Sequence, residues 1–577
     1  MTIVRRIEIE NFRGIKSLAW CPNPGFNCLI GSGDSGKTTV LDAIDICLGA
    51  RRNFSFADTD FHLLDISEPI KIGLVLGDLS DPMKSIDTYA DFLRGYDVAT
   101  DTLEEEPGVG LEVVLYLHLE VQQDLEPQWR LHSSRSEAKG IERNLKWPDR
   151  ETIAPLRLGA MGELNLSWRR GSLLNRISEE TPDASAALSA AAREARSTFG
   201  TTANTQLKDA LDVVDIAAKD LGIDMGSGAQ ALLDVHGTSF GSGTVALHSE
   251  NGVPARSFGT GSKRLLLAGM QKHATEASTI TLVDEVETGL EPHRLIRFIT
   301  SLGSKDTDTQ RQVFATSHSP TVLQELTHEQ MSVVRCDEAS GRTQVLSIPE
   351  ETQGLLRSRP SSFLTKSIVL CEGKTEVGFL RGFNYVMVAN GRQSFEGKAV
   401  GLLDFDGGHV ERPFKYASSL ISLGYRVAIF MDSDRRLPTK TVSDFGGEGG
   451  SLFAWENDFS IEQAIFDAAP NSVIVSILEL AQQENEKEIL VGRVSSASGG
   501  KFSFDDALEL ARNDTLTSEQ RAILGKAAGS SNSSSKGWFK NVDKAERLAR
   551  DVLAPNFKIL GEEFRTVVAD VLKWTAT

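Results

Sequence analysis

The sequence predicts an α/β fold in both halves of the chain. Short apolar runs such as Phe26 to Ile30, Ile280 to Val283 and Ser367 to Leu370 have the length and composition of buried strands. Each run is followed closely by glycines or acidic residues, and segments with helical spacing of apolar positions lie between the runs. Polar groups gathered after successive strands are typical of parallel sheets, whose carboxyl ends share one edge.

Composition limits the classes of protein to consider. A chain of 577 residues is too long for one compact core, so we expect about two to four domains. No apolar run approaches the ~18 residues that a membrane span needs, so no membrane association is expected. Five cysteines without C-x-x-C spacing argue against a disulfide framework or a zinc site and predict a reducing cytoplasm. The net charge of −19 means that any DNA contact must use a local patch or bound metal ions.

A glycine-rich loop follows the strand that ends at Ile30. Residues 31–38 have the pattern G-x-x-x-x-G-K-T and precede a helical segment, as in a P-loop. Backbone N–H groups of such a loop surround phosphates, Lys37 would reach the β and γ phosphates, and the Thr38 hydroxyl would bind Mg²⁺. We therefore predict ATP and Mg²⁺ as ligands. The predicted nucleotide-binding residues are Gly31, Gly33, Ser35, Gly36, Lys37, Thr38 and Thr39.

Two acidic residues and a histidine follow later strands. The strand from Ile280 to Val283 ends in Asp284 and Glu285, the form of a Walker B motif. Asp284 would support Mg²⁺, and Glu285 would polarise the attacking water. After a further strand from Gln312 to Thr316, His318 stands where it could face the γ-phosphate.

The order strand, Asp-Glu, helix, strand, His resembles that of the ABC ATPases. The resemblance implies that His318 is a switch histidine, that residues 289–291 form a D-loop, and that two subunits enclose nucleotide head to tail. Gly261, within the segment from Gly259 to Arg264, would then belong to the signature loop that caps the partner's nucleotide.

Two departures from the ABC pattern concern the rate of turnover rather than ATP binding. Lys263 stands where related signature loops commonly have glutamine. No clear Q-loop glutamine is present in the sequence, and Asp58 and Asp60 are the nearest candidates for that position.

A second group of acidic residues follows strands in the C-terminal third. The strand that begins at Ser367 leads to Glu372 and then Glu376, and the strand from Tyr425 to Met431 leads to Asp432 and Asp434. If both strands belong to one parallel sheet, these carboxylates meet at one edge and can hold Mg²⁺ or Mn²⁺.

A glutamate after one strand with a later Asp-x-Asp resembles the Toprim domain. An ABC ATPase followed by a Toprim domain resembles the OLD family, which includes the nuclease subunit of the Gabija anti-phage system and nuclease effectors of some retrons. The resemblance implies a two-metal nuclease site in which Glu372, Asp432 and Asp434 are catalytic. These three residues and Glu376 would bind the metal ions.

Two further residues are candidates for the same site. Glu462 resembles an acid that the family places at the start of a helix after the Asp-x-Asp strand, with Glu456 and Asp458 as alternatives. Lys540 resembles the C-terminal catalytic lysine of the family. Lys536 could equally fill that role, or the serine-rich segment around it could be a simple linker.

The predicted fold is thus α/β, an N-terminal ABC-type P-loop ATPase with a helical insertion and a C-terminal Toprim domain. Residues 1–163 and 236–350 would form the two parts of the ATPase. Residues 164–235 are rich in alanine and leucine with helical spacing, which predicts an insertion for dimerisation or for covering the core. Turn-forming residues precede the Toprim domain and its helical tail, residues 351–577.

These observations favour an ATP-regulated DNA endonuclease or nickase, an anti-phage defence effector that assembles as a homodimer or homotetramer. An ATP-gated DNA-binding or scaffold ATPase with an inactive Toprim domain is the alternative. A topoisomerase or primase is disfavoured because no tyrosine domain or zinc motif is evident. A helicase-like protein, or a retron reverse transcriptase with its DNA, would fit as a partner. The P-loop leaves open whether ATP activates cleavage, inhibits it or is merely bound.

Overall fold

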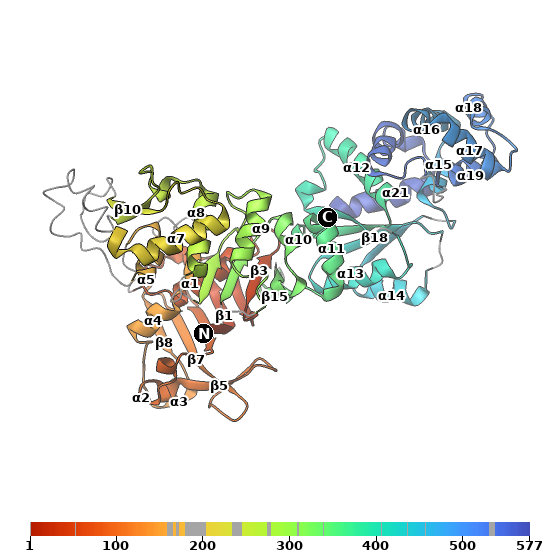
Figure 1. The fold of residues 1–577 in the computed structure, drawn as a ribbon. Coiled ribbons are helices and arrows are strands. Elements are labelled where there is room, and N and C mark those ends of the chain that lie inside the picture. Colours follow the sequence, from red (N-terminus) through yellow and green to blue (C-terminus); the bar gives the residue numbers. More distant parts are fainter. Residues whose placement is uncertain are drawn as a thin grey trace. The chain divides into compact units, whose positions relative to one another are not determined.

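The chain forms two compact units, Met1–Ile348 and Pro349–Thr577 (Figure 1). This computed structural model describes residues 2–51, 54–158, 165–168, 172–178, 204–233, 245–273, 279–307, 311–337, 340–405, 407–434, 437–455, 457–529 and 537–576. Among the helices of those residues, none combines the length and the apolar character that crossing a membrane demands. Each unit is described by itself below.

An antiparallel sheet opens unit 1. Its strands run in the order β2-β1-β4-β7-β5-β6, and β8 also pairs with β7. Apolar residues alternate along β1 and β4, and their buried side chains pack in one core with helix α1. The bounds are β1 Ile3–Phe12, β2 Ile15–Trp20, β4 Ile70–Gly77, β5 Leu93–Asp97, β6 Thr102–Glu104, β7 Glu112–Val121, β8 Pro127–Leu131 and α1 Lys37–Leu48.

A second, mainly parallel sheet carries the motifs of unit 1. Its order is β15-β14-β3-β13-β12-β9, with β15 as the antiparallel edge strand. The predicted strands before the P-loop, before Asp284 and before His318 are confirmed as β3, β12 and β13. They lie side by side, so their carboxyl ends share one edge. The bounds are β3 Phe26–Ile30, β9 Leu156–Leu158, β12 Ile280–Val283, β13 Gln312–Thr316, β14 Met331–Cys336 and β15 Thr343–Ser347.

Helices complete unit 1. Helix α7 packs closely on α8, where a Cβ at Gly269 would lie 2.6 Å from Leu221, so this crossing needs a glycine. The bounds are α2 Ile86–Tyr89, α3 Ser134–Ala138, α4 Trp147–Ile153, α5 Leu173–Ile177, α7 Lys208–Leu221, α8 Thr260–His273, α9 Pro292–Ser301 and α10 Pro320–Glu325.

The predicted helical insertion, residues 164–235, lies only in part within the described residues. Its alanine-rich stretch falls in residues 179–203, outside the described residues. Helix α7 lies within it, and the chain leaves the helical conformation before residue 235. Gly222 adopts a left-handed φ of 67° that ends α7, and Gln230–Leu233 forms strand β10, paired antiparallel with β11, Val245–His248.

Unit 2 is built on a parallel sheet with the order β17-β16-β18-β19. The strands are β16 Ser367–Cys371, β17 Val400–Asp404, β18 Arg426–Met431 and β19 Ser451–Ala454. Helices α12 Lys374–Ala389, α13 Arg412–Ser422 and α14 Thr439–Gly447 connect them. Cys371 aligns with both Asp404 and Phe430, so the segments that follow β16 and β18 start from the same edge.

A helical tail packs against this sheet in one continuous core. Phe379 and Phe430 join Trp455 and Phe564 there, and Trp538 is fully buried. The tail is therefore an integral part of unit 2. The helices of the tail are α15 Ile461–Ala468, α16 Asn471–Glu484, α17 Lys487–Ser498, α18 Phe504–Arg512, α19 Ser518–Gly529, α20 Val542–Arg547 and α21 Glu562–Ala576. A short helix, α11 Gln353–Ser358, precedes the sheet.

Candidate functional sites

The P-loop of unit 1 has the backbone that its glycines allow. Gly31 and Gly36 have φ of 143° and 93°, and a Cβ at Gly31 would lie 2.7 Å from the Val334 carbonyl oxygen. Nζ of Lys37 donates to Gly31 O at 3.2 Å, Ser32 O at 2.7 Å and Ser35 Oγ at 3.1 Å. The ammonium group thus lies inside the loop. Burial lowers the pKa of Lys37, and the nearby carboxylates of Asp34 and Asp284 oppose this shift.

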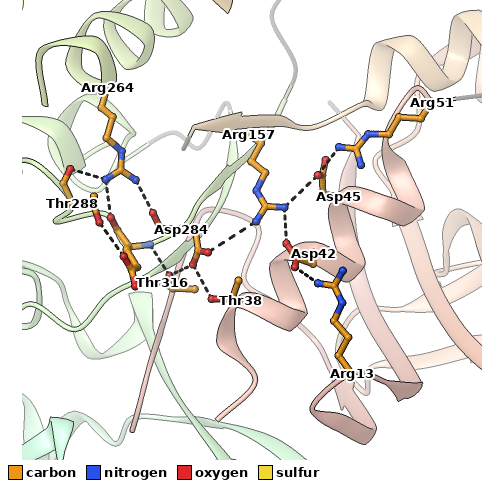
Figure 2. Close-up of polar contacts among 11 residues, drawn as sticks. Arg13, Thr38, Asp42, Asp45, Arg51, Arg157, Arg264, Asp284, Thr288 and Thr316 are labelled. Atoms are coloured by element: carbon orange, nitrogen blue, oxygen red, sulfur yellow. Dashed lines mark hydrogen bonds and ion pairs between the residues drawn. The ribbon is translucent and has the colours of Figure 1, made fainter. Parts of the chain in front are cut away.

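Thr38 and Asp284 meet beside the P-loop. The Thr38 hydroxyl donates to Asp284 Oδ1 at 3.1 Å, and the Thr316 hydroxyl donates to the same oxygen at 2.6 Å (Figure 2). A hydroxyl from the P-loop helix and a carboxylate from the end of β12 are therefore within reach of one ion. These residues fit Mg²⁺ with the phosphates of ATP. Gly33 faces open space, and Thr39 is half-buried in the first turn of α1.

Glu285 is held in a strained backbone conformation. Its φ of 47° lies in the left-handed region, which a residue with a Cβ seldom adopts. Its N–H donates to Thr316 Oγ1 at 2.8 Å, and its carbonyl accepts from Arg264 Nη1 at 2.7 Å. The exposed carboxylate accepts a hydrogen bond from Thr288 at 3.1 Å. The backbone is thus fixed while the carboxylate points to solvent, as polarising a water requires.

Arg264 and Glu287 are two residues whose roles sequence reasoning missed. Arg264 is buried in α8 and donates to the carbonyls of Asp284 at 2.6 Å and Thr288 at 3.0 Å, so it fastens α8 to the segment after β12. Glu287 accepts from the His318 N–H at 2.7 Å and from the Ser317 hydroxyl at 2.9 Å. The only feature of the sequence that could have indicated the role of Arg264 is its position directly before the apolar run LLLAGM.

Gly261 and His318 lie near these segments. His318 is exposed, two residues after the end of β13. Gly261 is buried, and a Cβ there would lie 2.2 Å from the Gly289 carbonyl oxygen. The candidate signature loop therefore packs on the candidate D-loop of the same chain, at a distance that only glycine permits.

In unit 2, Glu372, Glu376 and Asp432 lie at the carboxyl edge of the sheet. Glu372 follows β16 and its Oε2 accepts from the Asp432 N–H at 2.9 Å. Asp432 follows β18 and its Oδ1 accepts from the Ile461 N–H at the start of α15, at 2.8 Å. Glu376 lies in the first turn of α12 and accepts from the Gly373 N–H at 2.8 Å. The edge of the sheet therefore brings the two acid-bearing segments together as predicted.

Glu462 and Lys540 join the same cluster. Lys540 Nζ lies 3.1 Å from Glu462 Oε1, and the Ser460 hydroxyl donates to Glu462 Oε2 at 3.2 Å. Asp434 and Asp458 are exposed. The alternatives Glu456 and Lys536 lie outside the described residues. We define the acid cluster as Glu372, Glu376, Asp432 and Glu462 with Lys540.

The acid cluster holds more negative than positive charge in a buried place. Burial, followed by the charge of Glu462, raises the pKa of Glu376 to about 7. Burial, followed by Glu376 and Glu462, raises the pKa of Asp432 well above its usual range. Burial lowers the pKa of Lys540, but Glu462, Glu376 and Asp432 outweigh it and the pKa is raised. The carboxylates therefore favour any additional cation, including a proton.

These donors fit Mg²⁺ or Mn²⁺ by their chemistry, because both ions prefer carboxylate oxygens. Their positions fit less well. Within the described ranges, no three His, Cys, Asp or Glu side chains are arranged to hold a metal ion together. Metal binding at the acid cluster would therefore require its side chains to move.

The fold and the site of unit 1 together define an α/β P-loop ATPase of the ABC type. The chain belongs to the family described as "AAA domain, putative AbiEii toxin, Type IV TA system", whose model matches residues 26–324, more than half of the 577 residues. This range includes the P-loop, Asp284 and His318. ATP, together with Mg²⁺, is the ligand that such an ATPase implies.

Similar proteins include RecF. A segment of 54 residues, 9% of this chain, is 50% identical to the "DNA replication and repair protein RecF" of Vibrio vulnificus and spans 15% of that relative's length. The Smc head domain of Pyrococcus furiosus, bound to the C-terminal domain of ScpA, has 12% identity and a TM-score of 0.37, covering 62% of this chain and 98% of that one. The recombination mediator protein RecF has 12% identity and a TM-score of 0.34, covering 60% of this chain and 98% of that one.

Proposed function

We propose that this chain is an ATP-regulated, metal-dependent DNA endonuclease or nickase of the OLD family, with its acid cluster as a Toprim cleavage site, acting in anti-phage defence. The observation that carries the proposal is the meeting of Glu372, Glu376, Asp432, Glu462 and Lys540 at one edge of a parallel sheet. Buried carboxylates in excess over cations cost free energy in the folded state, and binding of a cation lowers that cost. Such groups are therefore candidates for a functional site.

Each residue has a role in this proposal. Glu372 fixes the backbone of Asp432, and Asp432 in turn holds the start of α15, which carries Glu462. Lys540 already compensates Glu462 and would meet the negative charge of a scissile phosphate. Asp434, exposed at the end of the same loop, would complete the ligands after DNA or metal binds. Mg²⁺ or Mn²⁺, when bound, would activate water and stabilise the leaving oxygen.

The ATPase unit would control access to that site. In this proposal Lys37, Thr38 and Asp284 bind Mg²⁺ and ATP, Glu285 polarises water and His318 contacts the γ-phosphate. Gly261 would belong to the loop that caps the nucleotide of a second subunit, so the protein acts as a homodimer or homotetramer. The short match to RecF, named a DNA replication and repair protein, agrees with DNA as the substrate. A helicase-like protein or a retron reverse transcriptase remains a candidate partner.

Plasmid cleavage tests the nuclease. Supercoiled DNA is incubated with the full chain and Mg²⁺ or Mn²⁺, for wild type, Asp432→Asn and Glu479→Gln. Glu479 is a matched control because it is an acid of unit 2 that pairs with Arg512 at the surface. Nicking by wild type and Glu479→Gln, lost in Asp432→Asn and in EDTA, is expected. Equal nicking by Asp432→Asn would refute the acid cluster as the site.

A second candidate, an ATP-gated DNA-binding scaffold with an inactive Toprim domain, draws on one observation. In the part of the chain that the structure describes, no three acidic side chains are already arranged around one ion position. This candidate predicts DNA binding that depends on ATP, measured by fluorescence anisotropy, without cleavage in either metal. Metal-dependent nicking that Asp432→Asn abolishes would exclude it.

A further inference from the structure

Arg157 lies beside the carboxylate of Asp284, near the helix that follows the P-loop (Figure 2). The two hydroxyls of Thr38 and Thr316 donate to Asp284 Oδ1. The other oxygen, Oδ2, lies 4.0 Å from Arg157 Nη2 (Figure 2). Arg157 is the middle residue of β9, which pairs with β12 so that Arg157 aligns with Leu282. A guanidinium group therefore stands beside the predicted magnesium ligand.

Two carboxylates of α1 hold Arg157 in that place. Its Nη1 lies 2.6 Å from Asp42 Oδ1 and 3.3 Å from Asp45 Oδ2. Asp42 and Asp45 are one turn apart on the helix that begins with Lys37, so they present a common face to β9. Burial lowers the pKa of Arg157, but Asp42 and Asp45 outweigh it and the pKa is raised. The guanidinium remains charged and is drawn toward α1 rather than into direct contact with Asp284.

The alternation of charges continues beyond α1. Asp42 also pairs with Arg13, and Arg13 Nε donates to Asp60 Oδ1 at 2.8 Å. Arg13 has a φ of 48° in the turn between β1 and β2, so its direction is set by a strained turn. A series of ion pairs thus leads from Asp284 to Asp60, one of the two residues nearest to a Q-loop position.

We propose that Arg157 is a positioning residue of the ATPase site that tunes how strongly Asp284 binds Mg²⁺ and how strongly the site attracts nucleotide. A positive charge about 4 Å from the carboxylate weakens the attraction of a divalent cation and strengthens that of the phosphates. Asp42 and Asp45 limit the effect, because they keep the guanidinium from pairing directly with Asp284. The inference rests on the ATPase class of unit 1 and is independent of the proposed nuclease.

Binding measurements on the full chain test Arg157→Gln. A fluorescent ATP analogue is titrated in EDTA, and Mg²⁺ is then titrated at fixed analogue. Without Mg²⁺, Arg157→Gln should bind the analogue about fivefold more weakly, and its half-saturating Mg²⁺ concentration should fall about fivefold. This is the size expected for a unit charge at this distance when water screens it. Arg157→Lys, which keeps the charge, should stay within about twofold of wild type in both measurements.

Asp45→Asn should shift the half-saturating Mg²⁺ concentration in the direction opposite to Arg157→Gln. It releases one of the two carboxylates that hold Arg157, so the guanidinium can move onto Asp284 and compete with Mg²⁺. The half-saturating Mg²⁺ concentration should therefore rise. Arg130→Gln is the matched control, because Arg130 is as exposed as Arg157, 32% against 30%, and pairs with Glu120 on the antiparallel sheet. It should leave both titrations unchanged.

A purely structural role of Arg157 predicts a different outcome. If Arg157 only fastens β9 to α1, Arg157→Gln lowers the midpoint of thermal unfolding while the Mg²⁺ titration of the folded protein stays at the wild-type value. That result, or a half-saturating Mg²⁺ concentration that rises in Arg157→Gln, overturns the proposal. If Arg157→Gln does not fold, Asp45→Asn still decides it, because the proposal predicts a higher half-saturating Mg²⁺ concentration for that variant and a structural account predicts the wild-type value.

Discussion

The ATPase site of unit 1 and the acid cluster of unit 2 differ in how deeply their carboxylates are buried and in which groups surround them. In unit 1, Asp284 is 25% exposed, accepts hydrogen bonds from two hydroxyls and lies 4.0 Å from Arg157, so it has polar partners before any ligand arrives. In the acid cluster, Glu376 and Asp432 are only 3% and 7% exposed, and Lys540 is their main counter-charge. The first arrangement suits a ligand that binds and leaves in each cycle. The second lowers its free energy when a further cation binds.

The largest expected effect concerns metal binding at the acid cluster. Asp432→Asn removes a carboxylate that lies between Glu372 and α15. We expect the nucleotide-free chain to lose Mn²⁺ affinity at this site by at least about 100-fold, because a direct ligand should matter more than the 10- to 100-fold typical of outer groups. Electron paramagnetic resonance of free Mn²⁺ measures this. Unchanged binding would place the metal elsewhere, and Glu479→Gln should bind as wild type does.

Removal of the P-loop ammonium should have the next largest effect. Lys37→Ala deletes a cation that lies inside the loop beside Ser35. A hydrogen bond to a charged group contributes about 1.5–3 kcal/mol, so ATP affinity should fall roughly 10- to 100-fold. Calorimetric titration with ATP and Mg²⁺ checks the value. Lys71→Ala, a surface lysine beside Glu10, should retain wild-type affinity, and a Lys37→Ala affinity equal to wild type would contradict the assigned site.

Loss of the counter-charge in unit 2 should destabilise the fold. Lys540→Met leaves the buried carboxylate of Glu462 without its ion pair. Breaking a buried pair costs about 3–5 kcal/mol, and we expect roughly 2 kcal/mol because the Lys540 side chain is 30% exposed. Mg²⁺ should restore part of the loss in urea unfolding.

Lys544→Met is the control for this prediction. Lys544 donates to the Glu484 carbonyl at 2.5 Å and to the Asn485 side chain at 2.9 Å, both neutral groups. Any loss of stability in Lys544→Met should not respond to Mg²⁺. The same Mg²⁺ response in both variants would show that Lys540 does not act as a counter-charge.

The smallest expected effect is a pH dependence of stability without metal. The pKa of Glu376 is about 7 in the folded chain, above its ordinary value of 4.5, so the folded state keeps a proton that the unfolded chain has released between these values. Stability is therefore lost as pH rises through this window. In EDTA, hydrogen exchange of peptides from α12 and α15 should become faster from about pH 5 to about pH 7, after correction for the intrinsic exchange rate. Glu376→Gln should flatten this dependence; an equally steep slope in that variant would assign it to another group.

Sequence predicted the groups that follow strands directly. Asp284, Glu372 and Asp432 each stand at the end of an apolar run, Lys37 follows another such run after the P-loop, and parallel strands bring such positions to one edge. The local pattern was sufficient to predict these residues, because a residue that follows a parallel strand lies at the edge of the sheet where the site forms. Of the three acids considered for the helix start, Glu462 lies in α15, and its Oε1 is 3.1 Å from Lys540 Nζ.

The local sequence pattern could not identify residues whose contacts depend on strand pairing or on helix packing. Arg157 lies on a three-residue edge strand, and only the pairing of β9 with β12 brings it to Asp284. Arg264 was included in the signature candidate, but its bonds to the backbone after β12 depend on how α8 packs. Helical spacing over residues 164–235 did not indicate where α7 ends, because the break depends on the left-handed conformation of Gly222.

The most direct test of the account is plasmid nicking as a function of ATP concentration, for wild type, Lys37→Ala and Asp432→Asn at fixed Mg²⁺ or Mn²⁺. The account predicts that Asp432→Asn is inactive at every ATP concentration. It also predicts that wild-type nicking changes with ATP, whereas nicking by Lys37→Ala does not. Nicking that Asp432→Asn retains, or an ATP response that Lys37→Ala keeps, would contradict the assignment of nuclease and ATP control to these two sites.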